Sequence, residues 1–482
     1  MNDTAKKNPV IVLFRHDLRL ADNRALYAAS QSGKPVVTVF VRDEVTSKSV
    51  RPPGGARRWW LHHSLAALSR SLDAMGQKLI LQKGRTQAIV ERLIKDTGAD
   101  TVLWNRRYDP AGIETDTLLK ARLQEQGIGA ESFDGHLLHE PWQLKTGAGG
   151  YYRVYTPFWR AFLNGPEPRD PVPAPKILQQ WTGSLSSDNL KDWALLPAKP
   201  DWAKAFHEDW TPGEEGAKEK LADFLDETVP SYQNDRDLPG IEGTSRLSPH
   251  LAHGEITPFQ IWHASRPSAV NDKNSGVDTF RKEVGWREFS YHLLFNNPKL
   301  DQDNFNKTFD AFEWDKNRKH FNAWKSGNTG YPIVDAGMRQ LWQTGWMHNR
   351  VRMIVASFLI KHLLIDWREG EKWFWDTLVD ADPASNAASW QWVAGSGADA
   401  SPYFRIFNPI LQGEKFDPDG AYVRQFVPVL KDLPDKYLHK PWTAPHAVLD
   451  AADIKLDENY PSPVIEHGYA RTRALDAYSR TR

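Results

Sequence analysis

Short apolar runs alternate with amphipathic segments over the first 135 residues of the chain. Five short runs are predicted to be β-strands: PVIVLF (9–14), PVVTVF (35–40), KLILQ (78–82), DTVLW (100–104) and AESFD (130–134). Between them, apolar residues recur at helical spacing in four segments: 21–30, 56–76, 86–98 and 113–127. This alternation predicts a parallel, doubly wound, Rossmann-like α/β sheet with right-handed crossovers. The first turn, FRHDLRLADN, lacks the G-x-G-x-x-G fingerprint, so we expect no dinucleotide bound there in the usual Rossmann manner.

The pattern changes twice further along the chain. Residues 136–211 are rich in proline, glycine and tryptophan, and they predict a long interdomain linker that packs over the surface. From 212 to 482 strand signals largely vanish while helical periodicity remains, which predicts an all-α domain. We therefore expect an α/β domain at 1–135, a linker at 136–211 and a helical domain at 212–482.

The composition excludes several kinds of site. The chain has 482 residues, no cysteine and a formal net charge of zero. Without cysteine it forms no disulfide, thiolate zinc site or iron–sulfur cluster, and we expect no metal site of any kind. The start MNDTAKKNPV lacks an apolar signal core, and no run of about 18 apolar residues predicts a membrane span. A cytoplasmic enzyme fits best, and its 21 tryptophans indicate large flat ligands as well as bulky core packing.

A hydroxyl-rich turn precedes a predicted helix in YQNDRDLPGIEGTSRLSPHLAHGE (232–255). Clustered hydroxyls and free backbone N–H groups at a helix start suit a phosphate group. A capped helix with a polar turn is the simpler interpretation of the same residues. His250 and His253 are three residues apart, but no carboxylate pattern completes a metal site, so we expect them to be solvated or to cap a helix.

A carboxylate, an indole and a guanidinium lie at helical neighbour positions in EVGWREFSYHLLF (283–295). Glu283 beside Trp286 resembles a desolvated acid that can donate a hydrogen bond to a ligand carbonyl. A surface pair of Glu283 with Arg287, next to a buried tryptophan, is an equal alternative.

The segment TGWMHNRVRMIVASFLIKHLLIDW (344–367) predicts one long helix with an apolar face. Asn349 and Arg352 share one side of this helix, with Met353 next to them, whereas Arg350 points elsewhere and could meet a phosphate. Polar groups on a buried helix need partners, which favours a polar ligand inside the domain.

The stretch DADPASNAASWQW (380–392) combines carboxylates, an amide and indoles within thirteen residues. A surface turn explains the acids and the proline, and a core position explains one tryptophan. Neither explains Asp380, Asp382, Asn386, Trp390 and Trp392 together.

Several motifs together resemble the photolyase–cryptochrome family of flavoproteins. They occur in the family's order and span nearly the whole chain: FRHDLRLADN, YTPFWR, EGTSRLSPHL, VGWREF, TGYPIVDAGMRQL, GWMHNRVRM, LLIDWREGEKWF and DADPASNAASWQWVAGSGADASPYFRIFNP. Within the family, the combination is similar to microbial cyclobutane pyrimidine dimer photolyases of class I or class III. The resemblance implies an α/β domain, a long linker and a helical domain that encloses FAD.

The resemblance also implies which residues serve the cofactor. Those expected to hold FAD are Tyr232, Thr244, Ser245, Arg246, Leu247, Ser248, Arg287, Asn349, Arg352, Asp380 and Asp382. Asn386 would face the central-ring nitrogen, where a neutral amide favours the fully reduced anion; plant-type cryptochromes typically place an aspartate there. Trp390, Trp367 and Trp314 would form, in that order, an electron-transfer chain from the flavin to the surface.

The substrate implied by the resemblance is UV-damaged DNA with a flipped-out dimer; photolyases are among the enzymes that take their target base out of the stack. Light-excited reduced FAD would donate an electron to the dimer, the ring would split and the electron would return. Residues expected to meet the DNA or the dimer are Arg236, Glu283, Trp286, Asn349, Arg350, Met353, Trp392 and Gln412. Glu283 would form a hydrogen bond to the dimer's carbonyl, and Trp286 and Trp392 would form opposite walls of the pocket that holds the dimer.

An antenna pigment is the weakest part of the resemblance. The loop NRRYDPAGIETD has Ala111 and Gly112 where folate-binding members carry an Asn-Glu pair. A methenyltetrahydrofolate held differently is the first expectation and an 8-hydroxy-deazaflavin the second, in a monomeric protein.

Three other functions are open to the same fold. A signalling cryptochrome is disfavoured by Asn386 and by the complete set Glu283, Trp286, Met353 and Trp392. A DASH-type relative that prefers single strands is a closer variant, distinguished by comparing repair of duplex and single-stranded DNA. A six-four photolyase would carry a histidine-rich arrangement where WMHNRVRM stands. A dark flavin oxidoreductase would need a nicotinamide site, and the sequence has no motif for one.

Overall fold

Five parallel strands form the sheet of the N-terminal α/β part, in a computed structural model that describes residues 7–45, 50–266, 275–400 and 404–481. The strands are β1 (Val10–Phe14), β2 (Val36–Arg42), β3 (Leu79–Lys83), β4 (Thr101–Asn105) and β5 (Gly129–Phe133), in the order β3-β2-β1-β4-β5. Val12 of the central strand pairs with Thr38 on one side and Leu103 on the other. The five predicted strands are confirmed, with bounds shifted by one or two residues.

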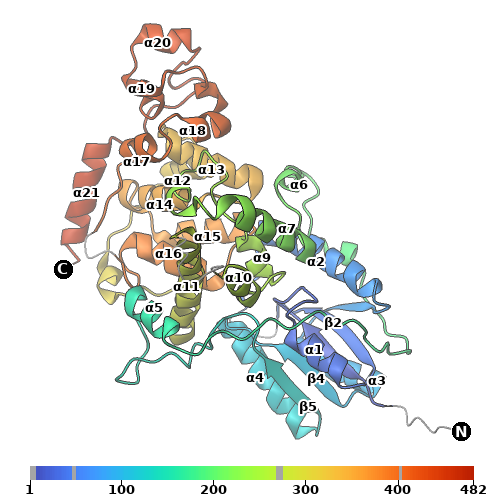
Figure 1. Cartoon of the computed structure of the whole chain (residues 1–482). Helices are drawn as coiled ribbons and strands as arrows, with labels where there is room; N and C mark the ends of the chain where they lie inside the picture. Colours follow the sequence, from blue (N-terminus) through green and yellow to red (C-terminus); the bar gives the residue numbers. More distant parts are fainter. Residues whose placement is uncertain (1–6, 46–49, 267–274, 401–403, 482) are drawn as a thin grey trace, which may run out of the picture.

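Helices cover both faces of this sheet (Figure 1). They are α1 (Arg24–Gln31), α2 (Gly55–Asp73), α3 (Thr86–Thr97) and α4 (Pro110–Glu125). Alternate residues of β1 enter different cores: Val12 packs with α1 and α2, and Ile11 packs with α3 and α4. Because both faces are covered, the central strand β1 is apolar and buried at every position rather than alternating, and the doubly wound prediction is confirmed.

Residues 136–211 connect the two parts of the molecule (Figure 1). They contain α5 (Tyr155–Leu163), η1 (Leu190–Trp193) and α6 (Phe206–Asp209). Tyr155 and Phe158 of this segment share a core with Phe289 of the helical part, whereas Leu178 and Trp193 pack with the sheet. The segment is fastened by backbone groups: Asp188 N donates to Leu81 O at 2.8 Å, and the Gln77 side chain donates to Leu178 O at 3.0 Å.

The rest of the described chain is helical, and no strand forms in it. Its elements are α7 (Glu214–Asp223), η2 (Phe224–Thr228), α8 (Tyr232–Asp235), α9 (Ser248–His253), α10 (Pro258–Ala264), α11 (Ser275–Asn296), η3 (Lys307–Ala311), α12 (Arg318–Lys325), α13 (Pro332–Thr344), α14 (Asn349–Ser357), η4 (Phe358–His362), α15 (Trp367–Thr377), α16 (Pro383–Ala394), α17 (Pro409–Phe416), α18 (Ala421–Phe426), η5 (Pro428–Leu430), α19 (Asp435–Leu438), η6 (Pro441–Thr443), α20 (His446–Ala451) and α21 (His467–Ser479). The all-α prediction is confirmed, and α19 and α20 project away from the sheet (Figure 1).

The prediction of one long helix over 344–367 is wrong. Gly345 ends α13 in the left-handed conformation with φ 69°, and α14 starts only after the His348 side chain accepts from Arg350 N. The helix then widens into the π-turn η4, and Asp366 caps the start of α15. The continuous apolar pattern hid a glycine stop and two new caps, which are local signals stronger than periodicity.

The two parts of the molecule interlock. Trp60 of α2 donates to the Glu255 carboxylate at 2.9 Å, and Arg19 donates to Gly254 O at 2.8 Å. Gly254 has φ 68°, and a Cβ there would lie 2.0 Å from His16 O, so only glycine fits this contact. In the described ranges, no helix is both long and apolar enough to cross a membrane.

Candidate functional site

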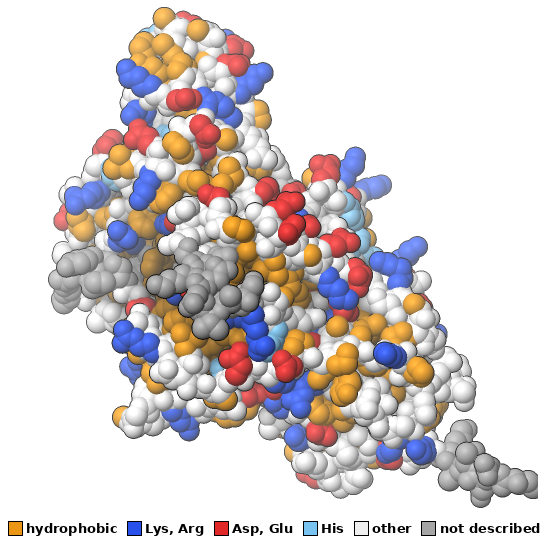
Figure 2. All heavy atoms as spheres, viewed as in Figure 1, with side chains coloured by type: hydrophobic (Ala, Val, Ile, Leu, Met, Phe, Trp, Pro, Cys, Tyr) orange, Lys and Arg blue, Asp and Glu red, His pale blue; other side chains and the backbone are white. Residues whose placement is uncertain are grey.

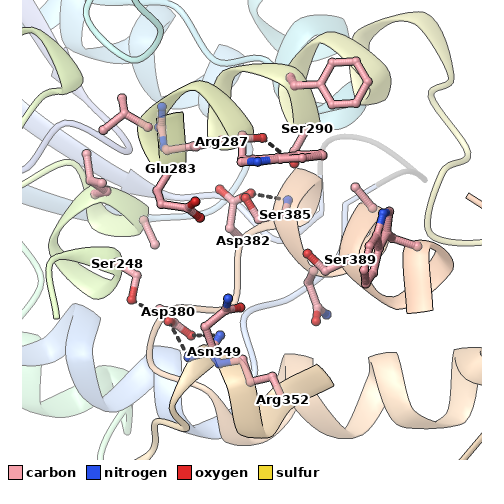
Figure 3. Close-up of a pocket in the computed structure, with 18 of the residues that line it drawn as sticks. Ser248, Glu283, Arg287, Ser290, Asn349, Arg352, Asp380, Asp382, Ser385 and Ser389 are labelled. Carbon is pink, nitrogen blue, oxygen red and sulfur yellow. Dashed lines mark hydrogen bonds and ion pairs between the residues drawn. The ribbon is translucent and has the colours of Figure 1, made fainter. Parts of the chain in front are cut away.

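A cavity of about 550 Å³ lies within the helical part, between α8, α9, α11, α14 and α16. It collects most of the residues that the sequence indicates: Tyr232, Arg236, Ser245, Leu247, Ser248, Glu283, Trp286, Arg287, Asn349, Arg350, Arg352, Met353, Asp380, Asp382, Asn386, Trp390 and Trp392. Figure 3 shows Glu283, Asp382 and Asn349 directed into this space from three different elements. Segments separated by more than a hundred residues therefore build one site.

Five predicted residues do not line the cavity: Thr244, Arg246, Trp314, Trp367 and Gln412. Arg246 has φ 51° and packs its guanidinium against the Trp210 and Trp346 rings, 4.6 and 5.0 Å from their centroids. Thr244 is half-buried in the turn before α9. Gln412 lies half-buried on α17, away from the cavity wall.

Asp380 is a fixed anion in the cavity wall. Arg352 donates to its carboxylate through Nη2 at 2.7 Å, and the Ser248 hydroxyl donates to it at 2.6 Å (Figure 3). The Asp380 side chain is 2% exposed, and Arg352 is held in turn by Met347 O at 2.7 Å. A buried carboxylate with both partners in place offers oxygen acceptors in a defined position.

Asp382 starts the helix that carries the amide and both indoles. Its Oδ1 accepts from Ala384 N at 3.0 Å and Ser385 N at 2.7 Å, which caps α16. The Tyr291 hydroxyl donates to Oδ2, and burial raises the pKa of Tyr291 well above its usual value, so it stays a donor. The cap fixes the direction of α16 and hence the positions of Asn386 and Trp390.

Asn386 has both amide hydrogens engaged. Its Nδ2 donates to the Glu371 carboxylate at 2.7 Å and to Glu371 O at 3.1 Å. Glu371 also receives two bonds from Arg51, each 2.7 Å long. The sequence patterns indicated neither Glu371 nor Arg51.

Two ion pairs lie on one side of the cavity. Arg236 pairs with Glu283 at 2.6 Å, and Arg350 pairs with Asp237 at 2.6 Å. The expectation of a desolvated Glu283 is wrong for the protein alone, since its side chain is 31% exposed and ion-paired. The alternative Glu283–Arg287 pair is wrong too, because Arg287 donates to His136 O at 2.8 Å.

Neighbouring residues hold two indole rings of the cavity in place. Trp286 stacks on Tyr155 with ring centroids 3.8 Å apart and planes 7° apart. Trp392 donates its Nε1–H to Asp399 O at 3.0 Å. Both rings line the cavity, so flat groups there can stack on rigid aromatic surfaces.

The three tryptophans predicted to form a chain share one core. Trp390 lines the cavity and is 2% exposed, Trp367 is fully buried with Nε1 donating to Asn304 at 2.9 Å, and Trp314 is partly buried. The ring neighbours of Trp390 are Phe374 and Trp324, with centroids 4.9 and 6.3 Å away.

Several polar residues at the cavity were missed by the motifs. Ser290, Ser385 and Ser389 line it, as Figure 3 shows. Ser290 lies three residues after Arg287, and Ser389 lies three after Asn386, so helical spacing from predicted residues was the available signal.

His250 and His253 are buried, which contradicts the expectation of solvated histidines. They are 1% and 4% exposed; His250 bonds the Glu255 carboxylate, and His253 lies 3.3 Å from Val379 O. Among the described residues, no group of histidine and acidic side chains is arranged to hold a metal ion. Figure 2 shows acidic and basic side chains interspersed over the face in view, in keeping with the zero net charge.

Comparisons with known proteins agree with this geometry. The family model for the FAD binding domain of DNA photolyase matches residues 280–480, and that for DNA photolyase matches residues 10–176. A deoxyribodipyrimidine photo-lyase of Agrobacterium fabrum is 60% identical over 98% of this chain and 98% of its own length. Cryptochrome-2 of Arabidopsis thaliana is 38% identical over 98% of this chain and 79% of its own length.

Solved structures give the same result. A bacterial class III photolyase from Agrobacterium tumefaciens has a TM-score of 0.96 at 58% identity, covering 100% of this chain and 99% of the other. A Synechocystis sp. PCC6803 cryptochrome has a TM-score of 0.86 at 28% identity, covering 97% and 99%. The chain therefore belongs to the photolyase–cryptochrome family, and its helical part contains that family's FAD-binding domain.

Proposed function

We propose that this protein is a deoxyribodipyrimidine photo-lyase that repairs cyclobutane pyrimidine dimers in UV-damaged DNA under light. One observation carries the proposal: a single cavity joins Asn386 and the Asp380–Arg352 pair to Glu283, Trp286 and Trp392. The first group suits a redox cofactor and the second suits a flipped base. The similarity to the Agrobacterium fabrum photo-lyase over nearly the full length supports it.

The cavity residues fit FAD. The Ser245 hydroxyl and the Arg352 guanidinium are donors for phosphates, and Ser248 holds Asp380 in place beside them. The Asp380 and Asp382 carboxylates are acceptors for sugar hydroxyls and ring N–H groups. Bound FAD supplies the light-excited electron donor. Tyr232, Leu247, Arg287 and Asn349 complete the enclosure, with Thr244 and Arg246 holding the turn beneath it.

The other side of the cavity serves the DNA. We assign Trp286 and Trp392 as the walls between which the dimer stacks, with Met353 beside them. Glu283 would form a hydrogen bond to a base carbonyl. Arg236, Arg350 and Gln412 would meet phosphates and hold the register of the strand. Stacking on two rigid rings offsets part of the cost of taking the dimer out of the helix.

The tryptophans keep the cofactor reduced in this proposal. Trp390 stands at the cavity, Trp367 lies in the core and Trp314 reaches the partly exposed side. The shared core thus supports a role for these three tryptophans in passing an electron from the surface to the cavity.

An antenna pigment is proposed, with methenyltetrahydrofolate first and 8-hydroxy-deazaflavin second. A Cβ at Gly112 would lie 2.7 Å from Arg107 Cβ and 2.7 Å from the Asp109 carboxylate. A larger residue cannot stand there without moving its neighbours, so any folate would have to be held by residues other than position 112. We further propose a cytoplasmic monomer with domains at 1–135, 136–211 and 212–482.

A blue-light photoreceptor is the second candidate, since Arabidopsis cryptochromes are 38% identical to the chain. The deciding experiment incubates reduced, FAD-loaded protein with duplex and with single-stranded DNA carrying one thymine dimer, in blue light and in darkness. Restored thymines only in light support the proposal, and restoration only in single strands indicates the DASH-type variant. Bound FAD without restoration in either substrate contradicts the enzyme and favours the photoreceptor.

A further inference from the structure

Arg51 reaches from the α/β part into the helical part. It lies in the loop before α2, and its guanidinium lies 4.1 Å from the centroid of the Trp375 ring on α15. The neighbouring backbone is fitted to the same helix: Trp375 Nε1 donates to Pro52 O at 2.9 Å, and Gly55 N donates to the Asp376 carboxylate at 2.9 Å. The contact is therefore part of the packed interface between the two parts.

Arg51 donates two parallel hydrogen bonds from its guanidinium to the Glu371 carboxylate. Nη1 and Nη2 each lie 2.7 Å from an oxygen of Glu371, which is 2% exposed. Such a two-bond pair fixes the plane of the carboxylate as well as its position. Asp301 Oδ2, 3.8 Å from Arg51 Nη1, is the other acidic group beside it.

Glu371 in turn determines which end of the Asn386 amide faces the cavity. Glu371 offers two acceptors to that amide, its backbone O and its Oε1, and no donor. Only the NH₂ end of Asn386 can bond both, so its carbonyl Oδ1 is the free end. A carbonyl accepts a hydrogen bond and cannot donate one, so it selects for a ligand atom that carries a proton.

We propose that Arg51 is a positioning residue that, through the Glu371 carboxylate, holds the Asn386 carbonyl toward the redox centre and so tunes the cofactor's reduction potential from the other part of the molecule. The inference rests on the proposed function in one respect, that FAD lies against Asn386. It makes the α/β part a contributor to flavin redox chemistry.

Charge gives the pair a measurable signature. Burial raises the pKa of Glu371, and the Arg51 guanidinium opposes that rise because it stabilises the ionised carboxylate. Without Arg51 an uncompensated anion would stand near the flavin at alkaline pH and would be neutralised as the pH falls. The reduction potential of the variant should therefore change with pH by more than that of the wild-type protein.

The test measures the reduction potential and the infrared spectrum of FAD-loaded protein across the neutral pH range for Arg51→Gln. At the alkaline end of this range, we expect the ratio of reduced to oxidised FAD in Arg51→Gln to be roughly three- to tenfold lower than in the wild-type protein at the same applied potential. Toward acid pH, the ratio should return to the wild-type value. The infrared band of the Asn386 carbonyl should broaden. Glu371→Gln should abolish the new pH dependence when added to Arg51→Gln.

Two controls separate the explanations. Arg318→Gln removes an arginine that pairs at 3.2 Å with Glu369, which lies on α15 as Glu371 does. This variant should leave the reduction potential and the infrared spectrum unchanged. Arg51→Lys keeps the charge without the fork, so the potential should stay near wild type while the carbonyl band still broadens. A potential and spectrum for Arg51→Gln that match those of Arg318→Gln overturn the inference. Wild-type protein that holds no FAD or repairs no dimer contradicts the proposed function instead.

Discussion

Arg236 and Glu283 face each other at the cavity with 2.6 Å between Nη1 and Oε1. Their side chains are 21% and 31% exposed, so the pair contributes little to stability. In the protein alone, the Arg236 guanidinium and the Glu283 carboxylate bind each other and so are not available to a ligand. A DNA phosphate that draws Arg236 away would leave Glu283 free to turn to the dimer.

Replacement of Arg236 by glutamine should weaken DNA binding and lower its salt dependence. One phosphate contact fewer reduces the slope of log affinity against log salt by about 1. Binding titrations over a range of salt concentrations measure that slope. Arg122→Gln, on an exposed pair with Glu91 of the α/β part, is the control and should keep the wild-type slope. Equal slopes for both variants would remove Arg236 from the DNA interface.

Glu283→Ala should lower repair per absorbed photon by about tenfold while FAD content stays normal, because a buried base carbonyl loses its partner. Repair yield in pre-reduced protein is the measurement, with FAD absorbance as the internal check. Glu215→Gln, whose side chain is 80% exposed on α7, should repair as wild type does. An unchanged yield for Glu283→Ala would be evidence against the assigned role.

Asn386→Asp should make reduced FAD reoxidise in air about tenfold faster. The new carboxylate would stand beside Glu371, and like charges at that distance disfavour a further negative charge on the reduced ring. Lowering the pH should restore part of the stability of the reduced form, since one of the two acids then takes up a proton. Flavin absorbance after mixing with air follows the rate; a wild-type rate at all pH values contradicts the prediction.

Trp390→Phe should slow photoreduction of oxidised FAD by about tenfold or more, equivalent to about 1.4 kcal/mol in barrier. Phenylalanine keeps the packing against Phe374 but is far harder to oxidise than indole. Protein reduced chemically beforehand should repair normally, which distinguishes electron supply from repair. Trp442→Phe, a partly buried tryptophan against Tyr331, is the matched control.

Glu288 should give folding a pH dependence. Burial raises its pKa from 4.5 to about 7, so the folded state binds more protons between these values and stability falls as the pH rises through that window. Glu288→Gln should flatten this fall, which amounts to roughly 3 kcal/mol. Thermal unfolding at several pH values measures it. The same curve for Glu288→Gln and wild type would show that Glu288 does not titrate there.

Local patterns in the sequence predicted much of this molecule. The strand of Val10–Phe14 is a short apolar run, and Asp382, Asn386 and Trp390 lie on one capped helix, so neighbouring residues carry enough information. The contact between Arg51 and Glu371 joins residues 320 positions apart, and no periodicity reports such a pairing. The prediction of one helix over 344–367 placed Asn349, Arg352 and Met353 on one side correctly but gave the wrong ends, because hydrophobic periodicity does not report the glycine stop at Gly345.

The fit of Gly254 against His16 O limits how this chain can be recombined with its relatives. A hybrid protein that takes its α/β part from one relative and its helical part from another would bring together two interface surfaces that were not complementary to each other. One added methyl group at position 254 would hold the halves apart along the seam where Trp60 and Glu255 also meet. A substitution along this seam in one half should therefore be tolerated only with a matching change in the other half.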